Sequence, residues 1–211
     1  MGDVTAIDIL LDPDSTMSQH AQAANSRLRQ AFPKGYALDA AHQPHISCLQ
    51  RYVKTEALET VYAAVGDVLN AEHPSAWKLT AYKYYYIPWK GLGLGGIVIR
   101  PTDELLAYQQ NLIDAIAPFA VPMGTAAAYF TTPEAPEIVQ PLIEYVANFV
   151  PNQTGKNFNP HVTIGLAPEE YLKGMLAEKF DMFTFSPAAV SVFQLGNYGV
   201  AAKKLNGWAL H

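Results

Sequence analysis

The chain has 211 residues, of which 50% are hydrophobic and 16% charged, so it can bury one sizeable core and is not a disordered chain. Its formal net charge of −5 argues against a broad basic face for long nucleic acid, because such binding depends on neutralising phosphates. The single cysteine, Cys48, excludes an intramolecular disulfide and a CxxC metal or redox site.

The first hundred residues predict an alternation of strands and helices. A β-branched, apolar run that ends in Asp12-Pro13 predicts the first strand. Apolar residues spaced three and four apart then predict an amphipathic helix capped by Asp14 or Ser15, and a second helix capped by Thr55. The predicted ranges are strands at 5–11, 45–53, 77–87 and 92–99, with the two helices between the first three strands.

The second half predicts three helices and further strands. The expected ranges are a helix from Thr102 or Asp103 to about 116, a helix at 137–149, a strand at 158–167, a helix at 168–179 and two strands within 183–209. The order of elements is typical of a degenerate internal duplication. Because no low-complexity linker divides the chain, we expect one bilobal α+β unit over residues 1–211.

Two short segments repeat the pattern proline, histidine, aliphatic, hydroxyl. They are Pro44-His45-Ile46-Ser47 and Pro160-His161-Val162-Thr163. Side chains of a strand alternate between its faces, so each histidine shares a face with the hydroxyl two residues later. The residues expected on the opposite, core face are Ile46, Cys48, Val162, Ile164 and Leu166.

The repetition carries the functional inference, because one copy alone does not. Either histidine by itself is better explained as a packed or hydrogen-bonded strand residue. Requiring a proline before the histidine lowers the expected number of accidental matches to about 0.04 per chain of this composition, against about 0.5 without it. Two matches on strand-like segments therefore indicate a site that is divided between two strands.

Two histidines beside two hydroxyls suit phosphodiester chemistry. Opening a cyclic phosphodiester needs a base that activates water and an acid that protonates the leaving oxygen, and histidine, with an ordinary pKa of about 6.5, serves both purposes. Hydroxyls can hydrogen-bond the phosphate oxygens. Because protein groups supply both acid and base, we expect no metal and no cofactor; His42 and His45 are three apart, but Pro44 between them disfavours the helix that a metal pair at this spacing would need.

The two motifs, together with the C-terminal segment 193–201 (FQLGNYGVA), resemble the 2H phosphoesterase superfamily and more narrowly the bacterial 2′-5′ RNA ligase-like (LigT-like) family. The resemblance implies two pseudo-symmetric lobes, each an antiparallel sheet backed by helices, around a water-filled cleft. It implies His45 and His161 as catalytic acid and base and Ser47 and Thr163 as phosphate ligands. The first motif carries serine where the family more often has threonine.

Aromatic residues near the predicted strands are candidates for stacking on a nucleobase, an interaction worth about 1–3 kcal/mol per base. They are Tyr86, Trp89, Phe158 and Tyr198. For each of them, packing in the core or on a sheet face is the better-supported alternative. Cys48 is expected to be a small buried hydrophobe, not a nucleophile.

The sequence therefore predicts a metal-independent phosphodiesterase that hydrolyses 2′,3′-cyclic or 2′,5′-linked nucleotide or RNA-end phosphodiesters. The alternatives are a non-catalytic nucleotide- or RNA-end-binding module and a reversible 2′-5′ RNA ligase; a serine hydrolase comes last, because no Gly-x-Ser-x-Gly elbow is present. We expect a small nucleotide or RNA-end substrate, no long nucleic acid, no membrane and a monomer. The compartment is cytoplasmic by default, or extracytoplasmic if Met1-Gly2 replaced a leader.

Overall fold

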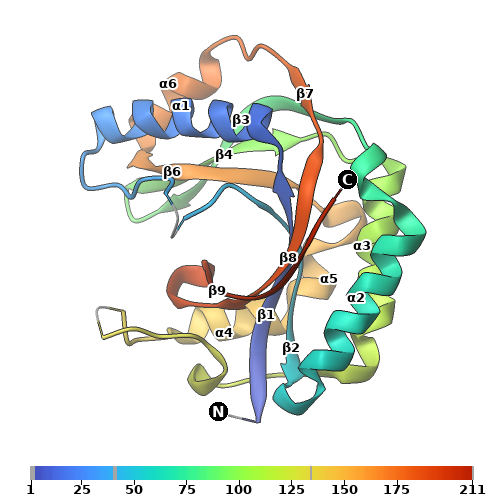
Figure 1. Ribbon diagram of the computed structural model, residues 1–211. Coiled ribbons are helices and arrows are strands. Elements are labelled where there is room, and N and C mark those ends of the chain that lie inside the picture. The colour runs from blue at the N-terminus through green and yellow to red at the C-terminus, as the bar shows by residue number, and fades with distance from the viewer. Residues whose placement is uncertain (1–2, 40–41, 134, 211) are drawn as a thin grey trace.

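The computed structural model describes residues 3–39, 42–133 and 135–210, which form two antiparallel sheets with flanking helices (Figure 1). One sheet has five strands in the order β5-β2-β1-β8-β9, and the other has four in the order β6-β4-β3-β7. The strands are β1 (Val4–Pro13), β2 (Ile46–Lys54), β3 (Leu79–Trp89), β4 (Leu92–Ile99), β5 (Ala120–Val121), β6 (His161–Pro168), β7 (Phe183–Phe185), β8 (Pro187–Leu195) and β9 (Ala201–Ala209). The helices are α1 (Ser15–Ala31), α2 (Leu58–Glu72), α3 (Asp103–Ile116), α4 (Gln140–Ala147), α5 (Phe149–Gln153) and α6 (Glu169–Ala177).

The two sheets interleave the N- and C-terminal halves of the chain. β8 pairs with β1, so the end of the chain completes the sheet that its beginning started, and β6 pairs with β4 in the other sheet. In Figure 1, α1 and α6 lie over one side of the four-stranded sheet, and α2 and α3 run side by side next to the five-stranded sheet. This connectivity brings the two predicted histidine strands, β2 and β6, into contact although they lie over a hundred residues apart in the sequence.

Most of the predicted elements are present, and their ends follow the local chemistry. Asp14 caps α1 by accepting hydrogen bonds from the N–H groups of Thr16 and Met17, at 3.0 and 3.2 Å. Thr102 caps α3 in the same way. The prediction for Thr55 was wrong, because it opens a separate 3₁₀ turn and α2 begins after Ala57.

Two predicted elements are divided by prolines. The helix expected at 137–149 is two helices, α4 and α5, because Pro151 has no N–H to donate and is tolerated only in a first helical turn. The two strands expected in 183–209 are three: β7 pairs with β3, and the chain crosses into the other sheet at Ser186-Pro187. Within the described residues, no helix is both long and apolar enough to span a membrane.

Candidate active site

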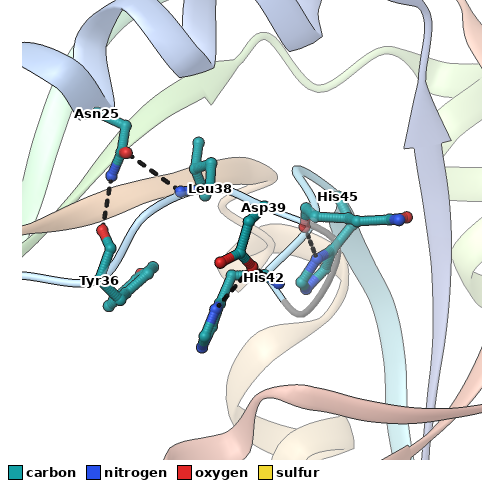
Figure 2. A network of polar contacts seen from close by, with 7 residues as sticks. Asn25, Tyr36, Leu38, Asp39, His42 and His45 are labelled. Atoms are coloured by element: carbon teal, nitrogen blue, oxygen red, sulfur yellow. Dashed lines mark hydrogen bonds and ion pairs between the residues drawn. The ribbon is translucent and has the colours of Figure 1, made fainter.

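The rings of His45 and His161 are held by the same local hydrogen bond. Nδ1 of His45 lies 2.7 Å from the carbonyl oxygen of Gln43, and Nδ1 of His161 lies 2.7 Å from that of Asn159, in each case two residues earlier. A carbonyl oxygen only accepts, so each Nδ1 carries the proton and each Nε2 is left for chemistry. Figure 2 shows the His45 ring where the loop from α1 enters β2.

The strand faces follow the predicted alternation up to the hydroxyl of each motif. The residues between and just after the histidine and the hydroxyl lie in the core: Ile46, Cys48, Val162 and Ile164. The histidines and hydroxyls themselves are half-buried. We call the face that carries the histidine the site face of each sheet.

Directly after each hydroxyl, both strands contain a β-bulge. On β2, Cys48 is an extra residue, because Leu10 of β1 pairs with Ser47 and Ile9 pairs with Leu49. On β6, Ile164 is extra in the same way, between the partners of Gly96 and Gly95. A bulge inserts one residue and so reverses the alternation beyond it.

The bulges move Gln50 and Leu166 to the site faces. Gln50 pairs with Asp8 of β1, and Leu166 pairs with Leu94 of β4. The prediction that Leu166 points into the core was therefore wrong; it is half-buried, and Ala167 takes the core position. Strict period-two alternation cannot foresee a bulge, which is why Gln50 was not among the predicted site residues.

Two buried amides cross between the halves and fix the bulges. Asn25 of α1 donates to the carbonyl oxygens of Ile164 (2.8 Å) and Tyr36 (3.0 Å), and its oxygen accepts from the N–H of Leu38 (Figure 2). It thus ties the loop before His45 to the bulge on β6. Gly165, with φ of +128°, is needed beside it, because a Cβ there would lie 2.8 Å from Asn25 Nδ2.

Gln109 of α3 makes the reciprocal connection. Its Nε2 donates to the carbonyl oxygen of Cys48 at 3.0 Å, and its Oε1 accepts from the N–H of Gly155 at 3.1 Å. It therefore ties the bulge on β2 to the loop that precedes His161. Each half thus uses one helix amide to hold its own motif loop and the bulge of the opposite motif. Neither amide was predicted, because each occupies a buried position of a helix whose pattern was defined by its apolar residues.

His45 acts electrostatically on His161. Burial is the main cause that lowers the pKa of His161; the hydrogen bond to Asn159 opposes it, and the charge of His45 lowers the pKa further. This effect agrees with the contact between β2 and β6. His161 is therefore held towards its neutral form.

A buried carboxyl lies below the first motif. Asp8 of β1 is fully buried, and its Oδ2 accepts from Ser47 Oγ at 2.6 Å and from Gln50 Nε2 at 2.9 Å. Burial raises the pKa of Asp8, which the charge of His45 and the two hydrogen bonds partly offset. The sequence signal was a lone acidic residue inside an otherwise apolar predicted strand.

Tyr85 covers the second motif. Its ring lies edge-on to that of His161, with centroids 4.8 Å apart, and in register Tyr85, Gly96 and Thr163 share the site face. Gly96 leaves the space for the ring, since a Cβ there would collide with Tyr85. The predicted candidate was Tyr86, which points the other way and packs against the core beside Gly93. Choosing between adjacent tyrosines requires the register, which the sequence does not contain.

The other aromatic candidates divide. Phe158 is 8% exposed and belongs to the core, so the structure contradicts its role in stacking on a base. Trp89 and Tyr198 are exposed and lie edge-on with centroids 6.0 Å apart, although one ends β3 and the other lies in the turn between β8 and β9. They join the rims of the two sheets.

Among the described residues, no group of three His, Cys, Asp or Glu side chains is placed to hold a metal ion. Cys48 is fully buried, and burial raises the pKa of its thiol, as expected for a small hydrophobe and not for a nucleophile.

The fold is similar to those of several solved structures. TT0787 of Thermus thermophilus shares 14% identity, with 98% of each chain covered and a TM-score of 0.56. Escherichia coli LigT complexed with 3′-AMP shares 12% identity over 99% of each chain, with a TM-score of 0.47. No protein-family model and no curated protein matches the sequence. With its two antiparallel sheets, flanking helices and one histidine strand in each sheet, the chain has the bilobal α+β fold of the 2H phosphoesterases.

Proposed function

We propose that the protein is a metal-independent phosphodiesterase that opens 2′,3′-cyclic or 2′,5′-linked nucleotide or RNA-end phosphodiesters. The observation that carries the proposal is the pair of histidines, each with an Nε2 left for chemistry, a fixed Nδ1–H and a hydroxyl two residues further on. The effect of the His45 charge on the pKa of His161 supports a single shared site.

The different surroundings of the histidines support different roles. His161, whose pKa is lowered by burial, is the base: its Nε2 takes a proton from the attacking water. His45 is the acid, and its Nε2–H protonates the leaving ribose oxygen as the P–O bond breaks. One water is consumed and a phosphomonoester forms, after which the proton on His161 must return to His45 through solvent. Ser47 and Thr163 would hold the phosphate oxygens, and their rigid strands would orient the phosphorus.

The exposed ring pair would hold the base. Trp89 and Tyr198 lie near each other on different sheets, so a base that contacts both would connect the two halves. Such stacking is tolerant of base identity. We therefore expect Trp89→Ala or Tyr198→Ala to raise KM for a small substrate such as 2′,3′-cyclic AMP about tenfold, with little change in kcat.

The direct test is hydrolysis of 2′,3′-cyclic AMP by His45→Ala and His161→Ala. Each substitution should lower kcat by about 10²–10⁴-fold, because each removes one proton-transfer group. His73→Asn is the matched control: His73 is an exposed histidine at the end of α2, and asparagine tolerates its left-handed backbone. Unimpaired hydrolysis by a folded His45→Ala, His161→Ala double variant would refute the proposal.

The same variants separate the alternatives. A binding module would be stabilised by 2′,3′-cyclic AMP in a thermal-shift measurement and would form no product. A reversible ligase would join an RNA 2′,3′-cyclic end to a 5′-hydroxyl end in a histidine-dependent manner. Hydrolysis without joining is the result that we expect.

A further inference from the structure

The Ser47 hydroxyl is already engaged, which bears on how it can bind phosphate. Its Oγ lies 2.6 Å from Asp8 Oδ2, and a serine has a single hydroxyl proton. If Asp8 is ionised, that proton is donated to the carboxylate, and Ser47 offers only lone pairs to an incoming phosphate. A carboxylate below the phosphate would also repel it. The geometry of the ionised pair therefore opposes phosphate binding.

The surroundings of Asp8 do little to stabilise its ionised form. Asp8 is fully buried and its two donors are both neutral, and within the described residues its Oδ1 has no hydrogen-bond partner. No lysine or arginine forms an ion pair with it among the described residues. Burying an unpaired carboxylate is costly, and burial accordingly raises the pKa of Asp8.

The groups around Asp8 come from four elements. His45 directly precedes β2 and Cys48 lies within it, and on α4 the nearby group is Tyr145, whose pKa is raised to about 12 by burial and by the charge of Asp8. On β8, the residue that pairs with Asp8 is the uncharged Phe193. Phe193 in turn pairs with the exposed Lys204 of β9, which therefore lies on the same face of the sheet. Among these groups of the described residues, only His45 and Lys204 can carry a positive charge, and His45 gives up its proton in the proposed reaction.

We propose that Asp8 is a positioning residue that acts in its protonated form, donating its carboxyl proton to Ser47 Oγ so that the Ser47 hydroxyl donates to the substrate phosphate. The inference rests on the proposed function, because it assumes a phosphate at Ser47. Gln50 Nε2 can donate to Oδ2 in either state of the carboxyl. Phosphate binding and retention of the Asp8 proton are then coupled, and a rise in pH that ionises Asp8 weakens binding.

The second motif has no corresponding carboxyl beside its hydroxyl among the described residues. Thr163 shares its site face with Gly96 and Tyr85, and no carboxyl hydrogen-bonds its hydroxyl within the described part of the chain. The coupling is therefore confined to Ser47, and it can be removed without touching the other half.

The test compares Asp8→Asn, Asp8→Ala and Ser47→Ala in hydrolysis of 2′,3′-cyclic AMP and in calorimetric binding of the product analogue adenosine 2′-monophosphate, from pH 5 to 9. In Asp8→Asn, Nδ2 donates permanently to Ser47 Oγ, and Gln50 can turn its amide to accept. Asp8→Ala should lower kcat/KM about tenfold, because the Ser47 hydroxyl remains but loses the hydrogen bond that orients it. Asp8→Asn should recover most of that loss, and its affinity for the product analogue should fall less with rising pH than that of the natural protein.

Ser47 provides the internal control, and Asp12 the external one. Asp8→Ala should add little to Ser47→Ala, because Asp8 acts through the Ser47 hydroxyl, which the second substitution has already removed. Asp12 also accepts a serine hydroxyl, that of Ser191 at 2.5 Å on the neighbouring strand, so Asp12→Asn removes a similar pair elsewhere and should keep the natural pH dependence.

Three results would overturn the role of Asp8. The first is an Asp8→Asn variant with kcat/KM as low as that of Asp8→Ala. The second is an unchanged pH dependence of product binding in Asp8→Asn. The third is a combined Asp8→Ala, Ser47→Ala variant whose loss of kcat/KM equals the product of the two single losses. If Asp8→Ala does not fold, the comparison of Asp8→Asn with Ser47→Ala decides alone. If the natural protein binds the nucleotide but does not hydrolyse it, the proposed function fails while the binding measurements still test Asp8.

Discussion

The β2 half and the β6 half of the site share a backbone and differ in what lies beneath it. Both have the Nδ1–carbonyl bond, the hydroxyl, the bulge one residue later and an amide from the opposite half. Below Ser47, however, the site face continues with Asp8 and Gln50, and below Thr163 it continues with Leu94 and Leu166. The pseudo-symmetry thus fixes the geometry, and the side chains on the floor make the two halves chemically different.

The largest effect on stability is expected where the two halves are alike, at the buried amides of Asn25 and Gln109 that connect them. Asn25→Ala leaves two carbonyls and one N–H without partners and should cost about 3–5 kcal/mol of unfolding free energy; Gln109→Ala, which strands one carbonyl and one N–H, should cost about 2–4. Urea unfolding measures both. Gln110→Ala is the control: Gln110 is an exposed neighbour that donates to Asp114, and the substitution should stay within about 0.5 kcal/mol. Equal costs for Gln109→Ala and Gln110→Ala would show that the crossed connection has no structural importance.

The buried carboxyl should make stability depend on pH in one half only. Because the folded-state pKa of Asp8 is raised above its unfolded value of 3.8, its favourable contribution is complete below pH 3.8 and is lost as pH rises through the folded value. Asp8→Asn should therefore gain about 1–3 kcal/mol relative to the natural protein between pH 4 and pH 8. Denaturant unfolding at both pH values checks this. A constant difference would mean that Asp8 has the same ionisation in the folded and unfolded states over this range.

Adjacent tyrosines distinguish the site face from the core face of the four-stranded sheet. Tyr85→Leu removes the ring that lies against His161 and should lower kcat/KM about tenfold, the upper range for an aromatic pair. Tyr86→Leu should mainly lower the melting temperature, because that ring packs against the core. If Tyr86→Leu impaired catalysis more than Tyr85→Leu at equal stability, the assignment of faces would be wrong.

The smallest effect concerns the communication between the histidines. His45 lowers the pKa of His161, so His45→Gln should raise the pKa of His161 as followed by NMR of the ring Cε1–H. The rise should be smaller than the whole shift, since burial is its main cause. An unchanged or lowered value would mean that the two rings are not close enough to share a phosphate.

The sequence was most informative where a pattern is local. The alternation around His45 and His161, the cap at Asp14 and the strand at Leu92–Ile99 all depend on neighbouring residues, and all were predicted. The resemblance to the 2H phosphoesterases gave the bilobal architecture, which the structure and the likeness to TT0787 confirm.

What could not be predicted depends on contacts between distant segments. The bulges at Cys48 and Ile164 are stabilised by amides from α3 and α1, and no local pattern announces them. A prediction that does not include the bulge on β2 places Gln50 on the core face. A prediction that does not include the register of β3 and β4 cannot prefer Tyr85 to Tyr86. Phe158 was expected near the substrate because it is an aromatic residue on a predicted strand, but packing placed it in the core.

The measurement that tests the central claim most directly is the pH dependence of kcat/KM for 2′,3′-cyclic AMP in the natural protein, His45→Ala and His161→Ala. If His161 is the base, activity of the natural protein should rise with pH through a pKa below 6.5. The residual activity of His45→Ala should keep that acidic limb, shifted to higher pH, and that of His161→Ala should lack it. An acidic limb that persists in His161→Ala and disappears in His45→Ala would contradict the assignment.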